Sequence, residues 1–318
     1  MQFWTVAIMA CGLALSGCAG PQETATTSGG MTDEEIENLV KRSWQYVAMY
    51  NVNNKGAMQY GGWNIVDVDT ELKDHTLKVI ARPNNDSLYI TCMLDLRSEP
   101  VILDMPAFDS KYVSLMVTGY DHYVNIPMST RQGDFDQPEK MLFFSDRTEG
   151  YEKGEQVEGI DRYFEATGDF LSAVFRVMPH ANEPERFERI KEQMQSVRLL
   201  TLSEYRGGEA KPIGDVDFPP VGKTDVDLFE NNLLEVMQFV FNHTTFDPAS
   251  ELDQKVLAAY EPLGVAPGQA YDPERVAKLD GQRVRQVAER IEAEEMAKAD
   301  RLAASTGLFK LKGDIGLD

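Results

Sequence analysis

Cysteine and histidine are scarce in this chain, which has three of the first and four of the second among 318 residues. We expect Cys11 to leave with a signal peptide and Cys18 to carry lipid, so Cys92 has no partner for a disulfide within the monomer. The histidines lack any spacing of the His-x-x-x-His kind, which would place two metal ligands on one helix face. We therefore predict neither a disulfide framework nor a metal site.

Motifs for several common chemistries are also missing. The chain has no Gly-x-Ser-x-Gly elbow, no phosphate-binding loop and no dinucleotide fingerprint. These absences disfavour serine-hydrolase, nucleotide-driven and nicotinamide-dependent reactions. No catalytic residue is assigned, and no cofactor is predicted.

Basic residues are few compared with acidic ones. The chain has 31 Lys and Arg against 52 Asp and Glu, which gives a formal net charge of −21 at pH 7. So acidic a surface repels other polyanions. The composition therefore disfavours nucleic acids and anionic lipid surfaces as partners.

The amino-terminal segment has the pattern of a lipoprotein leader. Residues 1–17 contain no charged side chain, and their apolar run is too short to cross a bilayer as a helix. The run ends in Leu15-Ser16-Gly17-Cys18, small residues before a cysteine, which matches a lipobox. The alternative is an ordinary buried helix, but residues 18–30 are small and polar and are typical of a flexible tether.

We therefore expect a signal peptide over residues 1–17 and a lipid anchor on Cys18. Several acyl chains at one cysteine are enough for stable attachment, which makes the membrane the first expected partner. The mature protein would then be extracytoplasmic. Ala19, in place of an Asp after the cysteine, favours the periplasmic face of the outer membrane.

The body of the chain opens with a helical pattern and then changes to a period of two. Thr32 and the acids after it predict a helix start, and apolar residues recur at helical spacing until the turn-rich stretch 51–56, where we expect the helix to end. β-Branched and aromatic residues then cluster in short runs. The expected strands are 76–82, 87–96, 100–105, 111–118, 122–126 and 141–145.

Helical patterns return after Tyr163. Pro184 begins one helix whose apolar face extends to Leu200, and further helices are expected from 224, from 251 to about 264, and from 273 to about 304. Residues 207–223 are rich in Gly, Pro and Asp and predict a linker or surface loop. The expected fold class is α+β, with an antiparallel β-sandwich over 31–206, an N-terminal helix and a helical region over 224–318.

Two stretches carry a family resemblance. Residues 81–89, Ala-Arg-Pro-Asn-Asn-Asp-Ser-Leu-Tyr, and residues 94–101, Leu-Asp-Leu-Arg-Ser-Glu-Pro-Val, resemble the signature of the bacterial domain of unknown function 1254. Lys111-Tyr112 and the pair Asp121 and Asn125 are similar to later family positions. Ser87 and Lys111 depart from the usual Thr and Arg.

The resemblance extends over about residues 44–205 and implies a β-sandwich with flanking helices, but no assigned reaction. Most family members continue into a second domain, of unknown function 1214, that has no counterpart here. A function that belongs to that second domain would need another chain. The expected protein partners are therefore a second copy of this chain or a separate second-domain protein.

Candidate site residues lie near predicted strand ends, where loops carry ligand groups. Asp121-His122-Tyr123 offers a carboxylate beside an imidazole, although neighbours in a strand point to opposite faces. Asn84 and Asp86 precede a strand, where Asn and Asp also form turns for local reasons. The full set of expected ligand-binding residues is Asn84, Asp86, Tyr89, Asp121, His122, Tyr123, Asn125, Arg176 and His180.

Two functions are compatible with these residues. The first is a non-enzymatic, lipid-anchored envelope protein that binds a small polar or glycan-like ligand or a partner protein. The alternative is a hydrolase or lyase of envelope carbohydrate, which requires Asp86, Asp121, His122 and Arg176 to converge in one pocket. Arg176 could hold a carboxylate bidentately in either case.

Overall fold

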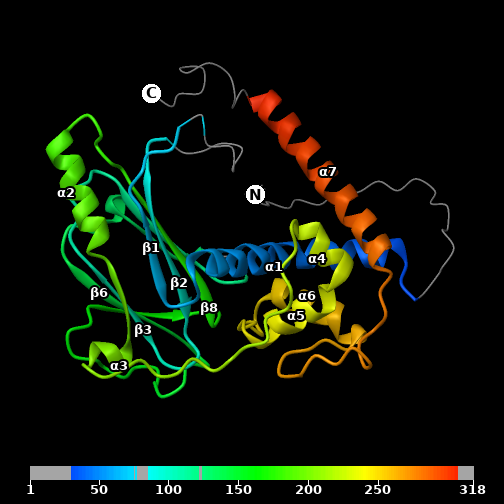
Figure 1. Ribbon diagram of the computed structural model, residues 1–318. Coiled ribbons are helices and arrows are strands. Elements are labelled where there is room, and N and C mark those ends of the chain that lie inside the picture. Colours follow the sequence, from blue (N-terminus) through cyan, green and yellow to red (C-terminus); the bar gives the residue numbers. More distant parts are fainter. Residues whose placement is uncertain (1–29, 75, 77–84, 122–123, 307–318) are drawn as a thin grey trace. The chain divides into compact units, whose positions relative to one another are not determined.

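The computed structural model describes residues 30–74, 76, 85–121 and 124–306 (Figure 1). Within these ranges the chain forms two compact units. The sandwich unit consists of Asn53–Val216 and His243–Thr245, and the helical unit of residues 30–52, 217–242 and 246–306. Among the described helices, none combines the length and the hydropathy that a membrane-spanning segment needs.

Two β-sheets form the sandwich unit. The first has the strand order β1-β2-β8-β4-β5, and all its neighbouring strands are antiparallel. Its strands are β1 (Ile65–Asp69), β2 (Leu88–Asp95), β8 (Phe170–Val177), β4 (Val113–Thr118) and β5 (Val124–Ser129). The second has the order β7-β6-β3-β9, with a parallel pair at β7 and β6. Its strands are β7 (Arg162–Ala166), β6 (Glu139–Ser145), β3 (Val101–Met105) and β9 (Arg198–Thr201).

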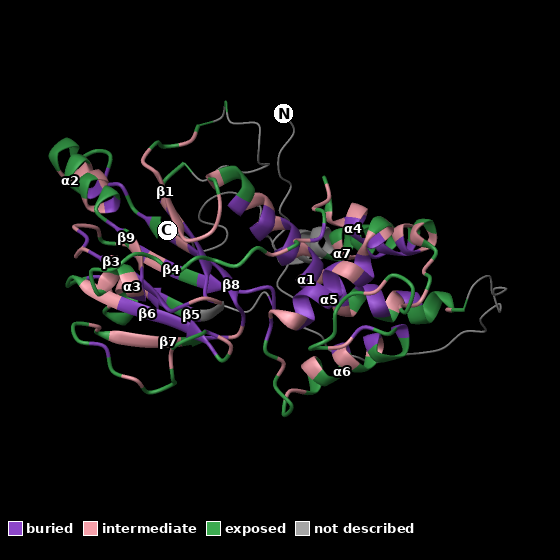
Figure 2. Ribbon diagram, turned by 60° about the horizontal axis from the view of Figure 1, so that its bottom comes forward, coloured by how far each residue is buried: buried purple, intermediate pink, exposed green. Residues whose placement is uncertain are grey.

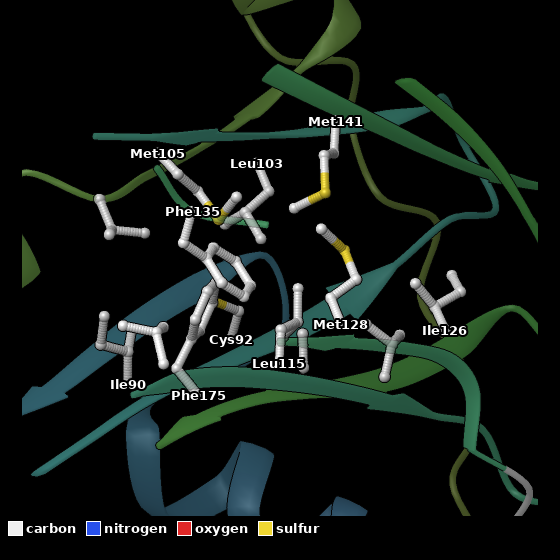
Figure 3. Packing of buried hydrophobic residues seen from close by; sticks show 14 of the residues in the cluster. Ile90, Cys92, Leu103, Met105, Leu115, Ile126, Met128, Phe135, Met141 and Phe175 are labelled. Atoms are coloured by element: carbon white, nitrogen blue, oxygen red, sulfur yellow. The ribbon is translucent and has the colours of Figure 1, made fainter. Parts of the chain in front are cut away.

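The main core lies between the two sheets. Every second side chain of each strand points inward, as the period of two requires. Leu103, Met105 and Met141 of the four-stranded sheet point toward Leu115 and Phe175 of the other (Figure 3). Cys92 belongs to the same cluster and is 0% exposed, and burial raises the pKa of its thiol to about 12. It therefore acts as a small apolar core residue.

Short helical segments complete the sandwich unit. Helix α2 (Pro184–Gln195) packs Ile190 and Met194 against the main core. A smaller apolar cluster on the other face of the four-stranded sheet includes Leu142 of β6 and Leu202 of α3 (Leu202–Tyr205). A 3-10 turn, η1 (Thr130–Gln132), follows β5. Strands β6 and β8 are largely buried, whereas the edge strand β7 is mostly of intermediate exposure (Figure 2).

The helical unit is built around aromatic contacts. Its elements are the first part of α1 (Asp33–Tyr60), α4 (Asp225–Asn231), α5 (Leu233–Asn242), α6 (Glu251–Tyr260), η2 (Glu261–Leu263) and α7 (Gly281–Thr306). Trp44 of α1 packs on Phe229 of α4, with ring centroids 5.1 Å apart. The Tyr260 hydroxyl shares a buried hydrogen bond of 2.5 Å with Ser43 Oγ, so its polar end has a partner inside the core.

The structure confirms the α+β fold class, with an N-terminal helix, a β-rich region of two sheets and a helical C-terminal part. We expected one domain over residues 31–206 and a helical region over 224–318. In the structure, the two units divide α1 between them, and His243–Thr245 belongs to the sandwich unit. Most of the expected strand at 76–82 lies outside the described residues. The expected strand at 122–126 overlaps β5, which extends to Ser129.

Several expected elements were wrong in detail. Helix α1 does not end before Asn51 but continues to Tyr60, because Asn51 and Asn54 are buried and find hydrogen-bond partners. The helix from Pro184 ends at Gln195, and Leu200 lies in β9. The long C-terminal helix begins at Gly281 rather than at residue 273. Strand β1 was not expected. Strands β7 and β8 were also not expected, since helical patterns were predicted to return after Tyr163.

Candidate functional site

One face of the five-stranded sheet points away from the sandwich core and carries a group of polar side chains that are exposed or half-buried. Strand register places five of them in a row across all five strands: Asp69, Tyr89, Arg176, Ser114 and Ser129. The next row on the same face is Asp67, Thr91, Val174, Met116 and Pro127. We call these ten residues, with Tyr112 and Met178, the outward face.

Tyr89 and Arg176 are the centre of the outward face. They stand opposite each other on β2 and β8, so their side chains are cross-strand neighbours. Arg176 is exposed, and within the described residues it has no ion pair or hydrogen bond through its guanidinium. Met116 and Met178 nearby are 38% and 40% exposed. The centre of the face therefore combines a cationic fork, an aromatic ring and accessible apolar surface.

The edge of the outward face at β1 is acidic. Asp69 forms an ion pair with Lys73, 2.7 Å between Nζ and Oδ2. Burial raises the pKa of Asp67, and the charge of Asp69 raises it further. Tyr60, in the last turn of α1, hydrogen bonds with Thr91, and burial together with Asp67 raises its pKa. This edge offers carboxylate oxygens that can accept hydrogen bonds from ligand hydroxyls.

A second polar cluster lies at the end of the sandwich where β8 begins. The Asp169 carboxylate is 2% exposed and accepts hydrogen bonds from Ser145 Oγ at 2.8 Å and Arg147 Nε at 3.1 Å. His243 Nδ1 lies 2.9 Å from its other oxygen. Burial alone would raise the pKa of Asp169, but the contacts with His243, Arg147 and Ser145 outweigh burial and lower it.

The same cluster ties in the distant segment His243–Thr245. Gly168 and Thr244 form an isolated antiparallel bridge. The Asp169 amide donates to the His243 carbonyl at 3.0 Å, and the Thr245 amide donates to the Thr167 carbonyl at 2.6 Å. The hydrogen bonds of Asp169 serve to hold the segment His243–Thr245 against the sandwich. Ser145 donates to the Asp169 carboxylate rather than to His243. The cluster is thus a structural network and not a serine nucleophile with its base.

The family motif at residues 94–101 also has a structural explanation. Arg97 forms a bidentate pair with the buried Asp95 carboxylate, and its guanidinium lies 5.1 Å from the centre of the Phe170 ring. The Glu99 carboxylate accepts the backbone amides of Ser203 at 2.7 Å and Lys211 at 2.8 Å. These acids hold loops in place and do not face an open site.

The structure brings some of the sequence-predicted residues together. Tyr89 and Arg176 are neighbours, and Asp86 lies at the same end of the sheet, where it is exposed and accepts a hydrogen bond from Ser87. His180 is also near this end, but it is buried and accepts the Lys111 amide at Nε2, 3.1 Å. Its backbone has a positive φ of 52°. His180 is therefore occupied by a local structural contact.

Other predicted residues lie elsewhere. Asp121 is buried and follows β4, whose last residue Thr118 stands opposite Ser172. Ser172 and Arg176 are four residues apart on β8, which separates their levels on the sheet by about 13 Å. Asp121 and Arg176 are thus at opposite ends. Asn125 lies in β5, and Cys18, Asn84, His122 and Tyr123 lie outside the described residues.

Sequence reasoning missed the two parts of the site that depend on strand pairing. Asp67, Asp69 and Ser114 join Tyr89 and Arg176 only through the register of the sheet, and β1 was not predicted. An Asp-x-Asp alternation within Ile65–Asp69 was the available signal. Asp169 and His243 are 74 residues apart, and no local pattern links them. The described residues contain no group of three or more metal-binding side chains.

Comparisons with known proteins give a family and a fold. No curated protein matches the chain. The crystal structure of the VPA0106 protein from Vibrio parahaemolyticus is similar, with a TM-score of 0.61 and 21% identity over 84% of this chain. The chain spans 59% of the length of that protein. A putative uncharacterised protein from Burkholderia cenocepacia has a TM-score of 0.30 and 12% identity, over 48% of this chain and 39% of that one.

The Vibrio structure supports the fold alone, since its identity to this chain is low. The family model covers the strands of the sandwich, from Asn64 just before β1 to Leu199 in β9. It includes both stretches of the chain that resemble the family signature. Residues 64–199 therefore match the model of the family described as "Protein of unknown function (DUF1254)".

Proposed function

We propose that this protein is a non-catalytic binding protein of the cell envelope, tethered by lipid at Cys18. Its outward face binds a small polar or glycan-like ligand. The observation that carries the proposal is the Tyr89–Arg176 pair, an exposed arginine beside a half-buried tyrosine at the centre of a row of polar side chains across the sheet. Rigid strands hold these groups in register, and a preorganised site loses little entropy on binding.

The chemistry of the face suits a ligand with both hydroxyl and C–H surfaces. The ring of Tyr89 offers an apolar face, and its hydroxyl offers a polar end. Arg176 can donate several hydrogen bonds in a fixed plane, and Ser114 can donate and accept. Saccharides present hydroxyls at their edges and C–H groups on their faces, so they match this combination.

Acid–base catalysis receives less support from the arrangement of the side chains. The hydrolase alternative required Asp86, Asp121, His122 and Arg176 in one pocket, but Asp121 and Arg176 are at opposite ends of the sheet. The buried acids Asp95, Glu99 and Asp169 are all engaged by local donors. A binding function needs none of these groups to be free.

The envelope location rests on the leader pattern. The uncharged apolar run, the small residues before Cys18 and the polar tether are the features of a lipidated precursor. A binding face on an anchored domain would hold its ligand close to the membrane surface. The acidic body would keep the domain itself away from anionic lipid headgroups.

A thermal-shift screen against neutral and acidic saccharides and small organic acids tests the binding function. A ligand present at 100 times its Kd stabilises the folded state by about 2.7 kcal/mol, which raises the Tm by several degrees. We expect at least one saccharide to do this for the wild type. Tyr89→Ala should abolish the shift, whereas Tyr271→Ala should keep it, since Tyr271 is a 37% exposed tyrosine of the helical unit. No shift with any compound, or an equal shift in Tyr89→Ala, would overturn the proposal.

A further inference from the structure

We infer that the ligand of the outward face is an acidic saccharide whose carboxylate binds Arg176. This inference rests on the proposed function and narrows it to one ligand class. Two observations support it. No acid stands next to Arg176 on the described part of the sheet, and Tyr89 has the cation Arg176 on one side and the acids Asp67 and Asp69 on the other. Each of these follows from the strand register and from the ion pairs of the described residues.

Within the described part of the sandwich unit, Arg176 and the exposed Arg131 are the two arginines that have no acidic partner. Arg97 pairs with Asp95, Arg147 with Asp169, and the arginines at 162, 186, 189, 198 and 206 also pair with carboxylates. In a chain with 52 acidic residues, an arginine without such a partner is unusual. Its guanidinium has five donors in a planar fork that fits a carboxylate.

The neighbours of Arg176 keep acids at a distance. Tyr89 and Ser114 stand opposite it on the adjacent strands. Val174 of β8 and Met178, which directly follows β8, flank it along the chain. All four are neutral. The nearest acid of its row, Asp69, is two strands away, or about 10 Å at the usual strand spacing. Within the described part of the sheet, a carboxylate supplied by a ligand would therefore meet the cation with no acid directly beside it.

The surroundings favour a sugar ring over a simple organic acid. Tyr89 lies on one side of Arg176, and Tyr112 is placed diagonally, since the Met178 amide bonds to the Tyr112 carbonyl at 2.9 Å. Together with the exposed parts of Met116 and Met178, these rings provide apolar surface for the C–H groups of a sugar. Ser114 provides a hydroxyl beside the guanidinium.

The acidic edge limits the charge of the ligand. Asp67 and Asp69 lie beyond Tyr89 and accept hydrogen bonds from hydroxyls, but they repel a second carboxylate. A saccharide with one uronic acid next to a neutral sugar satisfies both sides of Tyr89. A polymer with an acid on every sugar does not, and neither does a nucleic acid.

The experiment compares two disaccharides that differ in one carboxylate, cellobiouronic acid and cellobiose, by isothermal titration on the full chain. A charge-assisted bidentate contact should make the acid bind at least about tenfold more tightly than the neutral sugar. Arg176→Gln should remove this difference, and Arg176→Lys, which keeps the charge but loses the fork, should restore only part of it. Arg131→Gln is the matched control, because Arg131 is exposed in η1 and has no ion pair within the described part of the chain.

The outcomes separate the inference from the function that it narrows. Equal affinity for both disaccharides, or a preference for the acid that survives in Arg176→Gln, overturns the inference and leaves saccharide binding in place. If the wild type binds no saccharide at all, both the inference and the proposed function are overturned. An equal loss of acid binding in Arg131→Gln would show general charge attraction and would also overturn the inference. Circular dichroism of each variant confirms that the exposed substitutions leave the fold intact.

Discussion

Asp169 is a buried carboxylate that has donors on two sides. It differs from Arg176 in how its charge is compensated. Ser145, Arg147 and His243 all contact it, so its charge is compensated inside the protein. The charge of the Arg176 guanidinium faces solvent instead. The sequence predicted Tyr89 from its place in an expected strand and Arg176 from the apolar run before it. It could not predict Asp169, whose role depends on a histidine far along the chain.

Replacing Asp169 with Asn should lower the free energy of unfolding by about 3 kcal/mol, because Arg147 Nε and His243 Nδ1 then face a buried neutral amide in place of a carboxylate. Urea denaturation at pH 7 measures the change. Asp146→Asn is a matched control, since Asp146 pairs with the same arginine but is 45% exposed. That variant should lose less than about 1 kcal/mol.

Acid should bring the stabilities of the two variants closer together. The pKa of Asp169 is lowered in the folded state, so its contribution is fully present above the unfolded value of about 3.9 and is lost as the pH falls through the folded value. Asp169→Asn should therefore lose less stability than the wild type as the pH falls below about 4. Equal losses at neutral pH in the Asp169 and Asp146 variants would contradict the role of burial.

At the scale of elements, β8 and α1 explain most of the errors of the sequence prediction. Strand β8 is central in its sheet and is buried on both faces along its first half, so the alternation that identifies a strand is absent there. Helix α1 contains Asn51, Asn53, Asn54 and Gly56, residues that usually mark turns. Tertiary hydrogen bonds of Asn51 and Asn54 override that preference.

Gly56→Ala should stabilise the protein by about 0.5–1 kcal/mol, because alanine has the better helix propensity. An added Cβ would meet Met93 and Tyr60 at 3.8 Å, which is ordinary contact. Gly61→Ala should have the opposite sign and cost about 1–2 kcal/mol, since Gly61 follows α1 with a φ of +98°. Thermal unfolding of the two variants measures both effects, and a lower Tm for Gly56→Ala would contradict the continuous helix.

At the scale of the whole molecule, composition and pattern were sufficient for the fold class but not for the division of the chain. Strands in the middle and helices at the end predicted an α+β protein, and the family resemblance predicted the sandwich. The assignment of α1 to two units, and of His243–Thr245 to the sandwich, depends on contacts between distant residues. Periodicity describes one segment at a time and contains no information about such contacts.

The proposed anchor gives a whole-molecule prediction. Cys18→Ala should move the protein from the membrane fraction to the soluble periplasmic fraction, because no acyl chain can then be attached. Cys11→Ala is the matched control and should stay with the membrane, since it leaves the residues around Cys18 unchanged. Fractionation with immunoblotting measures both, and mass spectrometry of the wild type should find acyl chains on an amino-terminal cysteine. An unacylated chain that begins at Met1 would contradict the anchor.

The bridge between Gly168 and Thr244 has a consequence for synthesis on the ribosome. All strands of the two sheets are complete once residue 201 has emerged, but the contact of His243 with the second Asp169 oxygen, which Arg147 also contacts, comes only later. At about 5–20 residues per second, the nascent sandwich waits several seconds before His243 can contact this buried acid. The helices α4 and α5 are therefore translated before the sandwich unit gains its last segment, His243–Thr245. A fragment that ends at residue 216 never gains the contact between His243 and Asp169.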